Sequence, residues 1–114
     1  MSDCIFCRVA AGEVPARLVH EDAAAVAFHD LQPQAPTHVL IVPRRHIATL
    51  LDTTEADVEL LGHVVETAVA LARRLALDRE GFRLVWNCLE GAGQSVFHLH
   101  LHLLGGRRLR WPPG

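Results

Sequence analysis

Residues 98–104 constrain the fold more than any other part of the chain, because they read His-Leu-His-Leu-His-Leu-Leu. Successive side chains of a β-strand point to opposite faces of a sheet. As a strand, this segment places His98, His100 and His102 in a row on one face, with neighbouring side chains roughly 7 Å apart. The leucines on the other face are expected to enter a core, and the histidines are expected to form a site.

A solvated strand face that happens to carry three histidines is the weaker interpretation. Near neutral pH, imidazole acts as a base, an acid, a nucleophile or a metal ligand. A histidine-rich metal-binding tract is a stronger alternative, although such tracts are usually polar and low in complexity. The alternating leucines are instead typical of a sheet, so the segment favours a catalytic or binding site.

The chain has 114 residues, which predicts one domain over residues 1–114 with one hydrophobic core. Hydrophobic residues make up 50% and charged residues 21%, a composition typical of globular proteins. The formal net charge of -2 argues against a nucleic acid polymer as partner, because such binding needs a basic surface. A small anionic ligand held by local donors remains compatible with this charge.

The chain contains no apolar run near the ~20 residues that span a membrane. It begins Met-Ser-Asp-Cys, without the basic start and apolar stretch of a secretory signal. Its three cysteines, Cys4, Cys7 and Cys88, are an odd number, which fits a reducing compartment better than a disulfide framework. We therefore expect a cytoplasmic protein with no membrane partner.

The remaining segments predict an α+β domain with a largely antiparallel sheet. Strands are expected over residues 17–20, 24–29, 37–43, 82–87 and 98–104, the first two as a hairpin. A short helix is expected over residues 4–11 and a long helix over residues 52–77. The long helix presents one apolar face, made of Val58, Leu61, Val65, Ala68, Ala72 and Leu75.

The loop before the histidine segment, residues 90–95, reads Glu-Gly-Ala-Gly-Gln-Ser. Glycines let backbone N–H groups approach an anion closely, and Gln94 and Ser95 add side-chain donors. An anion bound there lies beside His100 and His102, an arrangement that suits nucleophilic attack on phosphorus. Taken alone, the same loop is more readily interpreted as an ordinary glycine-rich turn.

Other polar residues have both a structural and a functional interpretation. His38 and His46, each taken alone, are more often structural than catalytic, and Asp30 either caps a turn or accepts hydrogen bonds from a ribose. Cys4 and Cys7 have the C-x-x-C spacing of half a zinc site, whose other ligands would come from elsewhere. The alternative is two thiols packed at the base of a short helix.

Taken together, these motifs resemble the histidine triad family. Residues 98–104 match its signature of three histidines alternating with apolar residues, and residues 93–97 precede it as expected. Residues 28–38 look like the first nucleotide-contacting segment of that family. Residues 104–107 and the Trp-Pro-Pro-Gly of residues 111–114 resemble its Hint branch, the histidine-triad nucleotide-binding proteins.

The resemblance implies a HIT-like fold that dimerises into a ten-stranded sheet, and a purine nucleoside phosphoramidate hydrolase. His100 would attack the α-phosphorus, and water would release a nucleoside monophosphate from the nucleotidyl-histidine. His102, His38 and Ser95 would complete the catalytic set. The implied nucleotide-binding residues are Phe28, Asp30, Leu31, Asn87, Gly93, Gln94, Ser95, His100 and His102.

Two features depart from the well-known Hint enzymes. Cys88-Leu89-Glu90 replaces a small, polar, glycine-rich run after Asn87, which puts the leaving-group preference in doubt. Many bacterial relatives bind zinc through the N-terminal C-x-x-C, and that pattern implies Cys4, Cys7, His46 and His98 as ligands here. Such a zinc is structural and leaves His100 free, so the chemistry itself requires no cofactor.

Three other functions stay open at this level. A dinucleoside polyphosphate hydrolase or a nucleotidyl transferase would use the same histidine. A regulatory module would bind nucleotides with weak turnover. A zinc-binding interaction protein would not need His100 at all.

Overall fold

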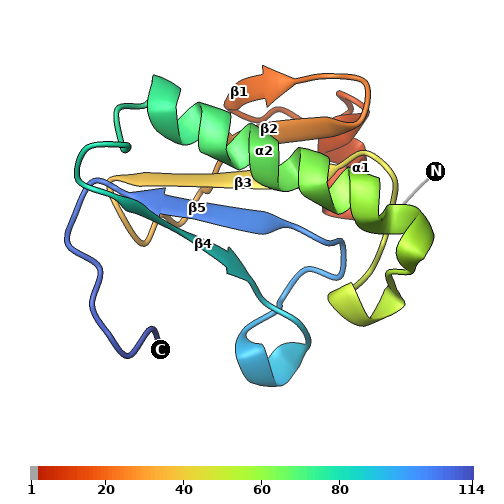
Figure 1. Ribbon diagram of the computed structural model, residues 1–114. Helices are drawn as coiled ribbons and strands as arrows, with labels where there is room; N and C mark the ends of the chain where they lie inside the picture. The colour runs from red at the N-terminus through yellow and green to blue at the C-terminus, as the bar shows by residue number, and fades with distance from the viewer. Residues whose placement is uncertain (1–2) are drawn as a thin grey trace.

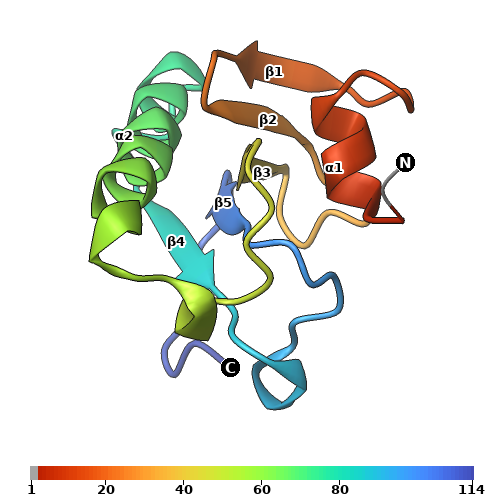
Figure 2. The same cartoon turned by 90° about the vertical axis from the view of Figure 1, so that its right-hand side faces the viewer.

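The structure is a computed structural model that describes residues 3–114. Its centre is a five-stranded antiparallel sheet in the order β1-β2-β3-β5-β4. The long helix α2 covers one face of this sheet, and the short helix α1 lies against the other (Figures 1 and 2). The expected α+β fold, with five strands, one long helix and one short helix, is confirmed.

The elements have the following bounds. The strands are β1 (Leu18–Glu21), β2 (Ala25–His29), β3 (Thr37–Pro43), β4 (Phe82–Trp86) and β5 (Leu101–Gly105). The helices are α1 (Ile5–Ala10) and α2 (Val58–Arg74). Short 3-10 turns cover Leu50–Asp52, Glu55–Asp57 and Glu90–Ala92.

Alternation along the central strands divides the core into two clusters. In β3, Val39 and Ile41 pack towards α2, whereas Leu40 and Val42 pack towards α1. The polar side chains of the site follow the same alternation, because His38 and His102 belong to the α1 side. The strand pattern thus supplies one face to the α2 core and the other face to the site.

Helix α2 begins at Val58, six residues later than the sequence pattern predicts. Two successive capping boxes, Thr49 with Asp52 and Thr54 with Asp57, hold the preceding residues in 3-10 turns. These turns satisfy the backbone groups that the predicted longer helix would have used. Within residues 3–114, no helix combines the length and the apolar character needed to cross a membrane.

The buried face of α2 also differs from the predicted one. Val58 is 64% exposed, whereas Val64 and Leu71 are almost completely buried beside Ala68 and Ala72. The predicted face was therefore right at its alanines and at Val65 and Leu75, which pack against the same core, and wrong at its first residue. Val58 is the first residue of α2 and stays exposed there.

Strand β5 begins at Leu101, not at His98, so the prediction of a strand over residues 98–104 is wrong in its first three residues. Antiparallel pairing matches Ile41 with Leu101. Two residues further, the partner is Pro43, which has no N–H to continue the ladder. The N–H of Leu99 instead donates to the carbonyl of Ile47, at 2.6 Å.

The β1–β2 hairpin is confirmed, and a carboxylate ties it to α2. Asp22 lies in the turn, and its Oδ2 accepts hydrogen bonds from Nε2 of His20 at 2.7 Å and of His63 at 2.8 Å. Burial alone would raise the pKa of Asp22, but the hydrogen bond from His20 and those from His63 and the backbone hold it well below its usual value. The charged carboxylate therefore joins the hairpin to α2.

Candidate functional site

A cavity of about 520 Å³ opens on the α1 side of the sheet. Its polar wall contains Asp30, His38, Ser95, His100 and His102. These residues come from the loop after β2, from β3 and from the segment leading into β5. The structure therefore brings together, around one cavity, the residues that the sequence predicted for catalysis.

The apolar wall of this cavity contains residues that the sequence analysis missed. Phe28 and Leu31 line it as expected, although Leu31 is 92% exposed. Ile5, Phe6 and Val9 of α1 line it as well. Their apolar spacing along a short helix was a usable signal, but only the tertiary structure shows which face of the sheet α1 covers.

His100 is held in one tautomer by its own neighbourhood. Its Nδ1 lies 2.7 Å from the backbone carbonyl oxygen of His98, so Nδ1–H donates to that oxygen. Nε2 is then unprotonated in the neutral ring and carries a lone pair. The edge of Phe6 packs against the His100 ring with centroids 5.1 Å apart, which fixes the ring further. A buried imidazole held in this way can act as a nucleophile.

The tautomers of the other two imidazoles follow from a chain of hydrogen bonds. The backbone N–H of Gln34 donates to Nδ1 of His38 at 3.0 Å, so His38 carries its proton on Nε2. That Nε2 lies 2.8 Å from Nδ1 of His102 and donates to it. His102 therefore carries its proton on Nε2, from which it can donate to a bound anion.

Asp30 lies at the start of this chain. Its Oδ2 is 3.4 Å from Nε2 of His38, and its Oδ1 accepts the backbone N–H of Gln32 at 2.8 Å. The atoms of Asp30, His38 and His102 that could bind a metal all lie within 4.8 Å of one another. A hydrogen bond already joins the two imidazoles, so this group needs no cation.

Burial keeps the three imidazoles neutral near pH 7. It lowers the pKa of His100 and of His38, against the opposing effects of the His98 carbonyl and of Asp30. For His102, burial and then repulsion from His100 and His38 lower the pKa to about 4. Neutral rings are what the nucleophile and the hydrogen-bond chain require.

In the loop before β5, some polar groups line the cavity and others form hydrogen bonds within the loop region. Gly93, in the left-handed region at φ +95°, and the exposed Ser95 line the cavity. Gln94 is only 3% exposed, and its amide bonds Leu89, Ala48 and Val96 within the loop region. The expected contact of the Gln94 side chain with phosphate is thus not what this geometry offers, since every polar atom of the amide braces the loop. Asn87 does not line the cavity either.

A second cluster includes His98, two residues before His100 in the chain. Sγ of Cys4 and of Cys7 and Nδ1 of His46 and of His98 all lie within 4.8 Å of one another. His98 donates its Nε2–H to the carbonyl of Pro43 at 2.7 Å, so its Nδ1 presents a lone pair to this cluster. The structure brings together all four residues that the resemblance implied as metal ligands.

The distances in this cluster suit a tetrahedral metal. Nδ1 of His98 lies 3.2 Å from Sγ of Cys4, 3.4 Å from Sγ of Cys7 and 3.2 Å from Nδ1 of His46. Tetrahedral zinc with bonds of about 2.0–2.1 Å to nitrogen and about 2.3 Å to sulfur separates its ligands by roughly 3.3–3.7 Å. Two thiols and two imidazoles are also the donor set that zinc prefers, so the residues fit the metal.

The HIT domain matches residues 11–109. The chain belongs to the HIT domain family. A HIT family hydrolase from Legionella pneumophila Philadelphia 1 superposes with a TM-score of 0.97 and is 52% identical, over 98% of this chain and 100% of that one. A histidine triad nucleotide-binding protein from Candida albicans gives a TM-score of 0.82 at 32% identity, over 96% and 83% of the two chains. The 14 kDa zinc-binding protein of Brassica juncea is 41% identical, over 98% of this chain and 100% of its own.

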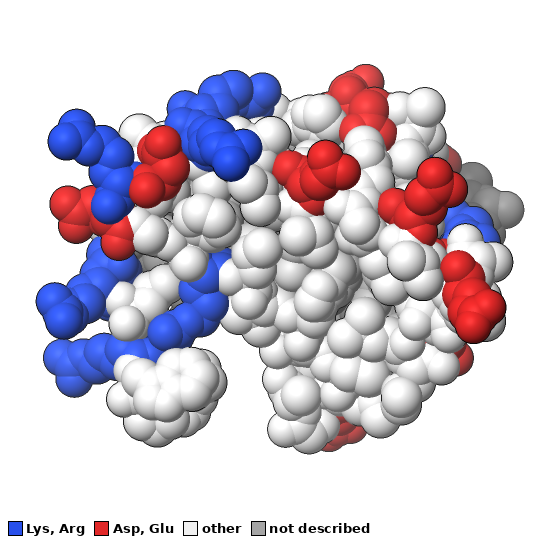
Figure 3. All heavy atoms as spheres, in the orientation of Figure 1, with Lys and Arg blue, Asp and Glu red and all other residues white. Residues whose placement is uncertain are grey.

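This HIT chain has a further cavity, of about 600 Å³, at the other end of the sheet. Arginines gather at that end, and the hollow between the C-terminal tail and the body is visible in Figure 3. Arg83, Arg107 and Arg108 line it, but none of the eight histidines does. His38, His100 and His102 instead line the cavity on the α1 side of the sheet.

Proposed function

We propose that the chain is a nucleoside phosphoramidate hydrolase of the Hint type, which cleaves P–N bonds through a nucleotidyl-histidine. One observation carries the proposal: His100 donates Nδ1–H to the carbonyl of His98 and so keeps a lone pair on Nε2 beside a nucleotide-sized cavity. Two relatives are named a hydrolase and a nucleotide-binding protein, which is consistent with this proposal.

In the first step, Nε2 of His100 attacks the phosphorus and the P–N bond breaks. The leaving nitrogen takes up one proton and departs as an amine, and Ser95 at the cavity wall is the proposed donor, reprotonated from water. The ring now carries a positive charge, which the Nδ1–H bond to the His98 carbonyl stabilises. The product of this step is an amine and a nucleotidyl-His100.

In the second step, water attacks the same phosphorus and the bond from phosphorus to Nε2 of His100 breaks. The electron pair returns to Nε2, and the attacking water releases one proton to solvent as the nucleoside monophosphate forms, which balances the proton that Ser95 took from water in the first step. His102 donates its Nε2–H to a phosphate oxygen in both steps, because His38 holds it in the required tautomer. Both residues act by binding and orientation, and neither changes its net protonation.

The cavity suits a purine nucleoside as the group that carries the phosphate. Ile5, Phe6 and Phe28 offer an apolar wall, and Asp30 lies at the same cavity as an acceptor for ribose hydroxyls. Apolar walls with a few placed polar groups are typical of nucleotide-sized sites. We therefore propose a purine nucleoside phosphoramidate as the substrate.

We propose zinc at Cys4, Cys7, His46 and His98, in a structural role. When bound, zinc supplies charge compensation for the two thiolates and has no open position for substrate. The name of the Brassica juncea relative is consistent with this assignment. His98 contributes its side chain to this set and its carbonyl to His100, so the two sites share a residue.

We propose that two copies pair through β4 into a ten-stranded sheet. β4 is the edge strand beside β5, and Phe82, Leu84, Val85 and Trp86 give it an apolar, half-buried character. An apolar strand at an open edge is a template for pairing with another chain. Sedimentation equilibrium is expected to give twice the chain mass of 12.6 kDa, and a mass of 12.6 kDa would contradict the dimer.

Hydrolysis of adenosine 5′-phosphoramidate tests the proposed activity, with AMP release followed by chromatography. Wild-type protein is expected to turn over, and His100→Ala is expected to lose turnover while still binding AMP. His63→Ala is the matched control, since it removes an imidazole of α2 that does not line the cavity. AMP binding without hydrolysis in the wild type would shift the assignment to another phosphate substrate or to a regulatory role.

A further inference from the structure

The cavity wall and the Cys-His cluster are built on the same short helix. Cys4 is the N-cap of α1, and Cys7 lies within it. Ile5, Phe6 and Val9, which line the cavity, lie among these thiols within residues 4–9. Any displacement of the N-terminal end of α1 therefore moves the cavity wall and the two thiols together.

The two ends of α1 are held by different groups. At the C-terminal end, Nη1 of Arg44 donates to the carbonyl of Ala10 at 2.6 Å. At the N-terminal end, Sγ of Cys4 lies 3.2 Å from Nδ1 of His98, and Sγ of Cys7 lies 3.4 Å from Nδ1 of His46. A metal bound to these atoms would connect the N-terminal end of α1 to the segment that carries His100.

We propose that the Cys-His cluster is a positioning element of the nucleotide cavity: metal bound there sets nucleotide affinity by holding Ile5 and Phe6 in place. This inference rests on the proposed function, because it concerns the same cavity. Phe6 is the transmitting side chain, since its ring lies edge-on to His98, to His100 and to Phe28, with centroids 6.0, 5.1 and 5.4 Å away.

The chemistry at His100 depends less on the metal than binding does. The carbonyl that fixes the His100 tautomer belongs to the backbone of His98. That backbone has its own supports, since Leu99 donates its N–H to Ile47 and the His98 ring donates Nε2–H to Pro43. Loss of metal is thus expected to raise KM and the Kd for AMP while kcat changes much less.

Thermodynamic linkage gives a test that does not depend on turnover. If metal tightens AMP binding by some factor, AMP must tighten metal binding by the same factor. Calorimetry would give the Kd for AMP in zinc-loaded and in chelator-treated protein. Competition with a chromogenic chelator would give the zinc Kd with and without AMP. Both factors are expected to agree and to lie at about 5 to 150, and a factor below five in either experiment would overturn the proposal.

Two variants keep the test interpretable if metal-free wild type loses its fold. His46→Ala removes the most exposed ligand while leaving both thiols and the Phe6 packing, and it is expected to show weaker AMP binding with its circular dichroism unchanged. Cys88→Ser removes the third thiol and is expected to retain the full coupling factor. If His46→Ala folds and binds AMP like the wild type, the proposal fails.

The outcomes separate this proposal from the proposed function. Zinc-loaded protein that does not bind AMP would overturn both. AMP binding and phosphoramidate hydrolysis that are the same with and without metal would overturn the positioning role alone.

Discussion

The Nδ1–H of His100 points at the backbone carbonyl of His98, 2.7 Å away, and not at any side chain. A main-chain acceptor cannot titrate, so the tautomer of His100 is fixed at every pH at which the fold persists. The lone pair on Nε2 is lost only when the ring itself is protonated. The proposed nucleophile is therefore limited by its own pKa alone.

The activity of the wild-type protein is expected to persist below pH 6.5, the usual pKa of histidine. Burial lowers the pKa of His100, His38 and His102, so the neutral forms survive into more acidic solution. The acidic limb of kcat/KM is the measurement, with phosphoramidate as substrate. An acidic limb centred at or above pH 6.5 would contradict the assignment of these buried imidazoles.

Acid is also expected to destabilise the fold in a defined window. His102 has a pKa of about 4 in the folded protein, against 6.5 for an unperturbed histidine. Between these values the unfolded chain binds more protons than the folded protein. The contribution of neutral His102 to the free energy of unfolding is therefore complete above pH 6.5 and declines as the pH falls towards 4. Thermal denaturation of wild type and His102→Gln at pH 7.5 and pH 5 checks this, and the acid-induced loss in Tm should be smaller in the variant.

Replacing His38 is expected to lower kcat with little effect on the affinity for AMP. His38→Ala removes the Nε2–H that holds His102 in its tautomer, and removal of a group that orients a functional histidine typically costs about 10- to 100-fold. His38→Asn retains a side-chain donor and should recover part of the rate. Steady-state kinetics decide, and an equal loss in both variants would show that donation to His102 is not the role.

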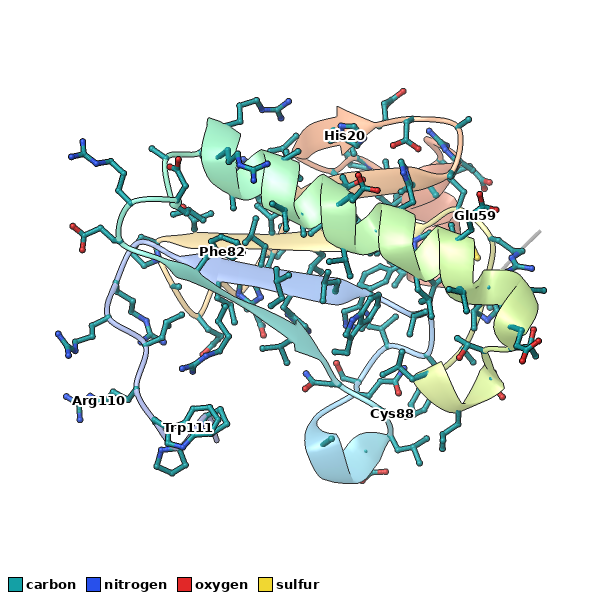
Figure 4. The ribbon with its side chains drawn as sticks, in the orientation of Figure 1. His20, Glu59, Phe82, Cys88, Arg110 and Trp111 are labelled. Atoms are coloured by element: carbon teal, nitrogen blue, oxygen red, sulfur yellow. The ribbon has the colours of Figure 1, made fainter. Side chains whose placement is uncertain are left out.

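Purified protein is expected to carry one zinc per chain. The double variant Cys4→Ser, Cys7→Ser should lose it, because a hydroxyl is a poor ligand for a metal that prefers thiolate. Cys88→Ser should retain it, since Cys88 lies at the loop after β4, apart from the cluster (Figure 4). Elemental analysis gives the count, and metal-free wild type from zinc-supplemented cultures would refute the site.

Gln94→Ala is expected to destabilise the protein by about 1–3 kcal/mol, the cost of leaving buried backbone groups without partners. The Gln94 amide bonds the N–H of Leu89 and the carbonyls of Ala48 and Val96. Gln32→Ala is the control, because the exposed Gln32 side chain braces no buried group. Urea denaturation is the measurement, and equal stability of the two variants would return Gln94 to a ligand-binding role.

Two valines on α2 separate the predicted face from the observed one. Val64→Ala is expected to cost about 1.5–3 kcal/mol, because it removes two buried methyl groups and leaves a cavity. Val58→Ala should change stability by less than about 0.5 kcal/mol, as exposed positions do. The reverse order would restore the face that the sequence predicted.

The alternation of residues was enough to predict the sheet and its central strand, but of the three histidines predicted in a row on one strand only His102 lies in β5. Alternation does not show where pairing begins, because the start of β5 depends on the residue opposite Leu99, which is Pro43. The start of α2 was misplaced for a similar reason, since the chain forms two capped 3-10 turns before the helix. Each error concerns a boundary that a contact or a competing cap decides.

In the candidate site too, some features were predicted from the sequence and others were missed. His38, His100, His102, Asp30 and Ser95 line one cavity, as the resemblance implied, and the four residues implied as metal ligands lie together. The contribution of α1 was missed, because six residues carry no periodicity that could say which face of the sheet they cover. Gln94 was assigned as a donor from the composition of its loop and from the resemblance, and only the structure shows that its amide is used within the loop.

The C-terminal tail carries a large exposed apolar side chain. Trp111 is 81% exposed and lies beside Arg110, apart from the sheet (Figure 4). Tryptophan is enriched at interfaces between protein chains. We expect the proposed second copy of the chain to cover Trp111. Variants of the tail are therefore expected to weaken the dimer in the sedimentation experiment.

His98 contributes its imidazole to the Cys-His cluster and its backbone carbonyl to His100. These two contributions depend differently on which amino acid stands at position 98. The imidazole serves as a metal ligand only while the two cysteines are present, although its Nε2–H also donates to the carbonyl of Pro43. The carbonyl exists for every amino acid. A descendant that lost the cysteines could therefore replace His98 with a residue that still donates to Pro43 and keep the acceptor for His100, so the metal cluster can be gained or lost while the nucleophile stays in place.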